Sequence, residues 1–169
     1  MVTRANLLVV LVGCGSAAAP APAHDTTTTQ ARTNKPPPVA SEDRKLVILV
    51  PEGMSNPSVD AARALNTYLH DEAKRDAMRK VDPATYEVVD MKLVRDCQAL
   101  DVTCLLAIGD ELHASELLYG SLQNKGKKLE IELHLFDVDS QVDVKWTGGG
   151  ADLKACAKNA YQQLTHPVQ

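Results

Sequence analysis

The stretch RKLVILVP, residues 44–51, decides how the rest of the chain can fold. Its five consecutive aliphatic residues have the length of a β-strand, and Pro51 and Gly53 close the run. A run without polar alternation is typical of a strand that is buried on both faces. The folded part is therefore expected to begin at residue 44 and to be built around this strand.

The segment after this strand carries an apolar stripe at helical spacing. Asn56 is the expected N-cap, Pro57 the first helical residue, and Asp82 with Pro83 the stop. A second strand is predicted at residues 85–90, so the strand, helix, strand order implies a parallel crossover. The apolar stripe consists of Val59, Ala62, Leu65, Leu69, Ala73 and Ala77.

The second half of the chain predicts a helix, three antiparallel strands and a final helix. The helix covers residues 102–112 with Asp101 as its cap, the strands lie within 115–148, and the last helix covers 151–164. In the middle strand the leucines and Ile131 alternate with mostly polar residues, so one sheet face is expected in the core and the other largely in solvent. We therefore expect helices on one side of the sheet only. The prediction is an α/β (α+β) domain, β-α-β-α-β-β-β-α, with a mixed sheet covered by helices.

The N-terminus has the plan of a secretory signal peptide. Arg4 precedes a compact apolar segment, residues 7–13, and small residues follow it. The apolar segment is far shorter than the roughly 20 residues that a transmembrane helix needs. The chain is therefore expected to be exported.

Residues 11–14, LVGC, resemble the lipobox of bacterial lipoproteins. The resemblance implies that residues 1–13 are a signal peptide and that Cys14 becomes the lipid-attached first residue. The next two residues lack the Asp that favours inner-membrane retention in this family, which implies the periplasmic face of the outer membrane. The alternative is cleavage after Ala23 at an A-x-A site, which would release a soluble periplasmic protein.

Residues 14–43 are rich in Ala, Pro and Thr and have no apolar period. Such a segment cannot bury enough surface to offset its ordering entropy, so a disordered tether is expected here. Fully flexible, it would span about 30 Å root-mean-square between the anchor and a domain at residues 44–169.

The charge balance excludes one class of partner. The chain has 18 basic and 22 acidic residues, for a formal net charge of −4. A nucleic-acid-binding protein needs a basic surface that displaces counterions from phosphates, so no nucleic acid is expected as a partner.

Cys97 and Cys104 are separated by six residues at the start of the predicted 102–112 helix. In an oxidising compartment a disulfide is the natural interpretation. A redox-active pair is less favoured because that chemistry uses C-x-x-C spacing, and zinc is less favoured because only His113 lies nearby as a further ligand. Cys156 lies on the apolar stripe of the last helix and is interpreted as a buried thiol.

The five histidines show no spacing typical of a metal or catalytic site. All five are interpreted as surface or capping residues, and neither a cofactor nor a metal is expected. They are His24, His70, His113, His134 and His166.

The loop PEGMSNP, residues 51–57, follows the first strand. Ligands often bind at the carboxyl ends of strands in α/β sheets. Glu52 disfavours a phosphate, so Glu52, Met54, Ser55 and Asn56 are candidates for contact with a protein partner.

Residues 96–141 resemble a small domain of exported proteins, similar to the amino-terminal domain of TolB and to the CsgG and FlgO-type lipoproteins. The resemblance extends over residues 44–165 and brings no catalytic residue with it. It implies a non-enzymatic envelope lipoprotein that docks another envelope protein or joins an assembly. The matching residues are Cys97, Cys104, Ala107, Ile108, Gly109, Leu117, Leu118, Gly120, Leu122, Leu133, Phe136, Asp137 and Val138.

A second hypothesis belongs to another functional class. It is a soluble periplasmic protein with a small-ligand or thiol-redox role, using the cysteine pair or an acidic cleft. It predicts reactive thiols, whereas the docking hypothesis predicts an inert disulfide.

Overall fold

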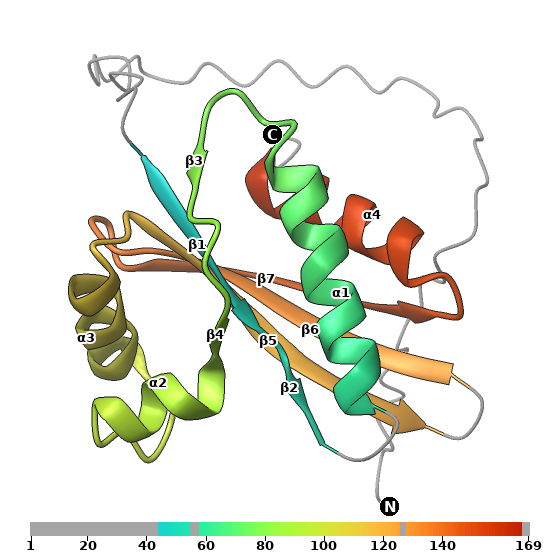
Figure 1. Cartoon of the computed structure of the whole chain (residues 1–169), viewed down its shortest axis with the longest axis horizontal. Helices are drawn as coiled ribbons and strands as arrows, with labels where there is room; N and C mark the ends of the chain where they lie inside the picture. The colour runs from blue at the N-terminus through green and yellow to red at the C-terminus, as the bar shows by residue number, and fades with distance from the viewer. Residues whose placement is uncertain (1–43, 55–57, 126–127, 167–169) are drawn as a thin grey trace, which may run out of the picture.

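The computed structural model describes residues 44–54, 58–125 and 128–166. In these ranges seven strands and four helices form one mixed α/β domain, which confirms the predicted class (Figure 1). The elements are β1 (Lys45–Val50), β2 (Glu52–Gly53), α1 (Ser58–Ala73), β3 (Lys80–Val81), β4 (Tyr86–Glu87), α2 (Val88–Val94), α3 (Val102–Leu112), β5 (Glu116–Lys125), β6 (Lys128–Asp137), β7 (Val142–Gly150) and α4 (Leu153–Thr165).

The sheet has the order β3-β1-β5-β6-β7. β1 is parallel to β5 on one side, and on its other side to β3 near its start and β4 near its end. The last three strands form the predicted antiparallel meander. β2 continues beyond β1 and pairs with β5.

β1 is buried on both faces, as its sequence predicts. Leu46, Ile48 and Val50 belong to a core with α1 and α4, whereas Val47 and Leu49 belong to a second core with α2 and α3. Helices therefore cover both faces of the sheet (Figure 1). The expectation of helices on one side only is wrong, because Phe136, on the face expected to be solvated, is fully buried in the second core.

Two predicted boundaries are also wrong in the first half. α1 ends at Ala73 rather than at Asp82, because Asp76 accepts a 2.9 Å hydrogen bond from the Met78 N–H and closes a turn. Of the strand predicted at 85–90, only β4 is a strand, and α2 follows it directly. The predicted N-cap Asn56 and the predicted first helical residue Pro57 lie outside the described residues.

The second half follows the sequence pattern closely. Asp101 caps α3 by accepting a 2.9 Å hydrogen bond from the Cys104 N–H. β7 continues through Gly150, two residues past the predicted end of the strands at residue 148. A Cβ at Gly148 would lie 2.4 Å from the Trp146 ring, so the glycine leaves room for that ring along its own strand.

A buried charged network joins the α1–β3 turn to β5 and α4. Arg79 bridges Glu116 at 2.6 Å and Asp76 at 2.9 Å, and the Tyr161 hydroxyl donates to Asp76 at 3.0 Å. Burial acts to raise the pKa of Asp76, but hydrogen bonds from Met78, Arg79 and Tyr161 outweigh it and lower that pKa. Removing one member would leave a buried charge uncompensated, so the network holds the three segments together.

His70 is buried in α1, so its interpretation as a surface residue is wrong. Its Nε2 atom has no hydrogen-bond partner, and burial followed by the nearby charge of Lys74 lowers the pKa of the imidazole. The folded state therefore holds His70 neutral at a pH where the unfolded chain begins to bind a proton.

We expect this histidine to make the protein less stable in mild acid. Below about pH 6.5 the unfolded state binds more protons at this position than the folded state, so the free energy of unfolding falls as the pH falls. His70→Leu should flatten the slope of unfolding free energy against pH between pH 7 and pH 5. Urea unfolding at several pH values measures this slope, and an unchanged slope in the variant would contradict the assignment.

Candidate functional site

A hollow of about 320 Å³ opens where β1 ends. Most of the residues that line it are apolar, and they come from the β1–β2 segment, the start of α1 and the β4–α2 junction. The lining residues are Val50, Pro51, Glu52, Gly53, Met54, Val59, Ala62, Arg63, Glu87, Val88 and Val89.

The segment after β1 forms one wall of this hollow. Glu52 and Gly53 pair with β5, and the Met54 N–H donates to the Leu122 carbonyl at 3.2 Å. A Cβ at Gly53 would lie 2.8 Å from the backbone of Val59. The glycine therefore allows the first turn of α1 to pack directly against β2, which places Met54 and Val59 on the same hollow.

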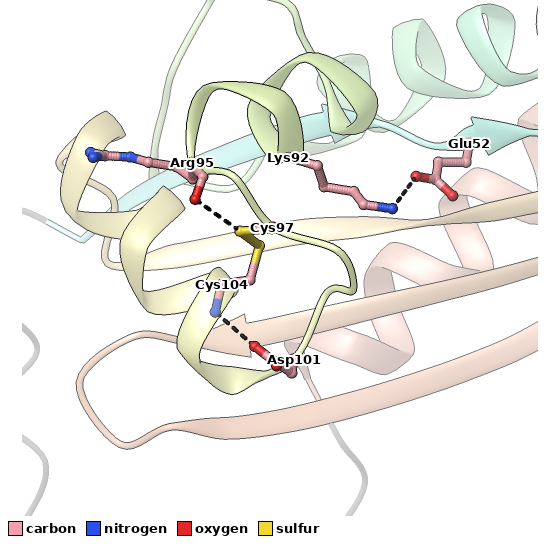
Figure 2. Close-up of a disulfide and its surroundings, with 6 residues drawn as sticks. All are labelled: Glu52, Lys92, Arg95, Cys97, Asp101 and Cys104. Atoms are coloured by element: carbon pink, nitrogen blue, oxygen red, sulfur yellow. Dashed lines mark hydrogen bonds and ion pairs between the residues drawn. A yellow bond between two sulfur atoms is a disulfide. The ribbon is translucent and has the colours of Figure 1, made fainter.

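Two ion pairs border the hollow. Glu52 lies 3.6 Å from the Lys92 ammonium of α2, and Figure 2 shows the two side chains pointing toward each other. Glu87 lies 3.3 Å from the Arg63 guanidinium of α1. Such partly exposed pairs contribute little stability, but they leave these carboxylates balanced by cations. The hollow is therefore better suited to bind apolar side chains than a free anion or cation.

Four apolar side chains of α2 and of the segment after β1 are exposed, and two of them, Met54 and Val89, line the hollow. Leu93 is 74%, Met54 68%, Val94 65% and Val89 52% exposed. Val89 and Leu93 are four residues apart and share one side of α2, whereas Val88 and Met91 are buried in the core. Large apolar side chains grouped on a surface are typical of a protein contact. We call these four exposed side chains, Met54, Val89, Leu93 and Val94, the α2 patch.

A disulfide fixes the position of α2. Cys97 follows this helix, Cys104 lies in the first turn of α3, and their sulfur atoms are bonded with the Cα atoms 5.8 Å apart (Figure 2). Cys104 is only 4% exposed. Cys156 of α4 is buried in the core, as its position on the apolar stripe of this helix predicts.

The structure brings together only some of the residues singled out in the sequence. Glu52 and Met54 line the hollow, whereas Ser55, Asn56 and Cys14 lie outside the described residues. Val89, Leu93 and Val94 were not predicted as candidates, because residues 88–90 were expected to end a strand and residues 91–94 were assigned to no element. The apolar residues of the segment VVDMKLV occur all around a helical turn, and that pattern could have indicated a short helix with an exposed apolar side.

No group of three or more His, Cys, Asp or Glu in the described ranges could hold a metal ion. None of the helices in the described part of the chain has the length and apolarity to cross a membrane.

No protein-family model and no curated protein matches the chain. Among solved structures, TolB from Acinetobacter baumannii has a TM-score of 0.50 and 11% identity over 74% of this chain and 29% of TolB. LpoB from Escherichia coli has a TM-score of 0.46 and 17% identity over 88% of this chain and 86% of LpoB. PelC from Paraburkholderia phytofirmans has a TM-score of 0.45 and 13% identity over 76% of this chain and 91% of PelC.

The match to TolB shows a shared fold. The chain spans less than a third of TolB, so the match concerns one part of that larger protein. The CsgG and FlgO part of the sequence resemblance stays a prediction.

We expect the disulfide to stabilise the domain. Replacing Cys97 and Cys104 together by Ser should lower the free energy of unfolding by about 2.5 kcal/mol, because the unfolded chain loses a closed ring of eight residues. Urea unfolding of the oxidised protein and the double variant measures this difference. A reductant should destabilise the parent protein by a similar amount and leave the variant unchanged, and equal stability of both oxidised proteins would contradict the prediction.

Proposed function

We propose that this chain is a non-enzymatic lipoprotein of the bacterial envelope that docks another protein through the hollow and the α2 patch. Cys14 carries the acyl chains at the periplasmic face of the outer membrane, and residues 14–43 form the tether. The domain from residue 44 onward binds the partner. The observation that carries the proposal is the α2 patch beside an apolar hollow.

The anchor is supported by the N-terminal sequence. The four lipobox residues, 11–14, stand at the end of an apolar segment that suits a signal peptide. Each buried methylene of an acyl chain contributes about 0.8 kcal/mol, so several chains hold a protein firmly at a bilayer. The disulfide fits the same location because disulfides persist in oxidising compartments.

Docking is supported by the composition of the site. A protein interface typically has an apolar centre and a polar rim. Here the apolar floor and the exposed Leu93 would form the centre, and the ion pairs of Glu52 and Arg63 the rim. Leu93 is the most exposed of the four patch side chains and is the expected anchor residue.

The thiol-redox alternative is less well supported by the cysteine environment. Disulfide exchange requires a thiolate to reach a sulfur atom, and Cys104 is almost completely buried while Cys97 is partly buried against the second core. The pair also lacks C-x-x-C spacing. Its contacts are those of a structural link between α2 and α3.

The anchor predicts a specific mass for the mature protein. Expressed in a bacterium that processes lipoproteins, the chain should begin at Cys14 and carry added acyl mass in the membrane fraction. Cys14→Ala should lose both the acyl mass and the membrane association. Intact-mass measurement decides this, and a soluble parent chain that begins at His24 would contradict the anchor.

The docking face predicts a position-specific crosslink. A photo-crosslinking amino acid at Leu93 should give one discrete adduct with an envelope protein in the native organism, because a partner covers this side chain. In binding measurements with that protein, Leu93→Ala should cost more than about 1 kcal/mol, as expected for an apolar anchor.

Met78 is the matched control for Leu93. It is an equally exposed apolar side chain, but it lies in the turn before β3, near the opposite end of β1. A crosslinker at Met78 should give no discrete adduct, and Met78→Ala should leave binding unchanged. Equal effects at both positions would contradict docking through the α2 patch.

A further inference from the structure

β7 is a long edge strand. Its nine residues pair with β6 on one side, and no strand of the described residues pairs with its other side. The opposite edge of the sheet is formed by β3 and β4, which have two residues each. A long edge presents a row of backbone donors and acceptors that can pair with another strand.

The side chains of β7 alternate between two different environments. Trp146 and Val144 face the core with α1 and α4. Val142 lies on the same face of the strand but is exposed. Asp143 and Lys145 lie on the other face, and no residue of β7 belongs to the core with α2 and α3. The edge therefore has an apolar side and a charged side.

The two charged side chains are held in place by the neighbouring strand. Asp143 accepts at 2.8 Å from Nδ1 of His134, and Lys145 bridges Glu132 at 2.6 Å. The second ring nitrogen of His134 lies 3.1 Å from Glu132. Because these contacts already restrict the side chains, little further ordering is needed when a partner pairs with the edge.

A two-fold axis perpendicular to the sheet makes two copies of β7 antiparallel and keeps each face on the same side. In the register centred on Val144, Asp143 lies opposite Lys145 of the partner subunit. The symmetry repeats this pair, so two oppositely charged pairs form across the axis. Val142 then lies opposite Trp146 of the partner subunit on the apolar face.

The neighbouring registers are unfavourable. Centring the axis on Asp143 places that carboxylate opposite Asp143 of the partner subunit, and centring it on Lys145 opposes two ammonium groups. Like charges directly opposite each other destabilise a strand pair, whereas opposite charges stabilise it. The charge pattern of β7 therefore favours the register centred on Val144 over these two neighbouring registers with a second copy of the same chain.

We propose that two copies of this chain pair through β7, antiparallel and centred on Val144, to form one continuous sheet. This surface is separate from the hollow, and the proposal does not depend on the proposed docking function. The occupant of the β7 edge is a second copy of the chain.

Crosslinking in the exported full-length chain tests the register. Val144 is the one β7 position that meets its own counterpart, so Val144→Cys should give a covalent dimer on a non-reducing gel that a reductant removes. Thr147→Cys, on the same strand, and the parent chain should stay monomeric on that gel. Absence of the Val144→Cys dimer, or an equal dimer from Thr147→Cys, would overturn the proposal.

Charge reversal tests the pairing in solution. Sedimentation velocity of the purified full chain in mild detergent should show a dimer. Asp143→Lys and Lys145→Glu should each raise the dimer dissociation constant by about tenfold or more, because each places like charges opposite each other. A 1:1 mixture of the two variants should dimerise again, because every lysine then faces a carboxylate.

Two outcomes of this experiment overturn the proposal. The first is a monomeric parent chain, and the second is a mixture that dimerises no better than either variant alone. Thermal melting of each variant checks that it is folded. Should one charge variant fail to fold, the Val144→Cys crosslink decides the question, because that change is conservative in size.

Discussion

The structure depends on the burial of β1 on both faces. Leu46, Ile48 and Val50 contact one helical layer while Val47 and Leu49 contact the other, so both cores share a single strand. Each fully buried aliphatic side chain contributes about 1.5 to 3 kcal/mol relative to exposure, and no other strand of the described residues serves both layers so completely. The two ends of β1 lie beside two further features of the domain. The network of Arg79, Asp76 and Glu116 lies at its start, and the hollow lies at its end.

The two helices that help to line the hollow differ greatly in length. α1 is sixteen residues long and packs along the sheet with α4, whereas α2 has seven residues and buries only Val88 and Met91. So short a helix gains little stability from its own hydrogen bonds. The Cys97–Cys104 disulfide supplies a restraint that its small buried surface does not. A helix held in this way can leave Val89 and Leu93 uncovered, which is what a docking face requires.

The long elements could be predicted from the sequence, and the short ones could not. β1, α3, β5, β6, β7 and α4 each contain enough residues to repeat a period of 2 or 3.6, so their patterns are visible locally. β2, β3 and β4 have two residues each and exist only because a neighbouring strand pairs with them. Residues 88 and 89 are β-branched, so a strand ending at residue 90 was the natural interpretation, whereas the structure has a helix that begins at Val88. Glu52 and Met54 could be predicted as candidates because they directly follow a strand that is visible in the sequence. Leu93 could be recognised only from the tertiary structure, which shows that its side chain is exposed.

The sheet order also separates the two surfaces that the structure leaves exposed. The hollow adjoins β1, β2 and β4, whereas β7 is two strands away from β5, on the far side of the sheet from β3 and β4. Pairing through β7 would therefore leave both hollows of a dimer open. Two anchored copies would then present two docking faces on one rigid sheet. A partner with two matching sites would bind the second one intramolecularly, so its overall affinity would exceed that of a single face without any new contact.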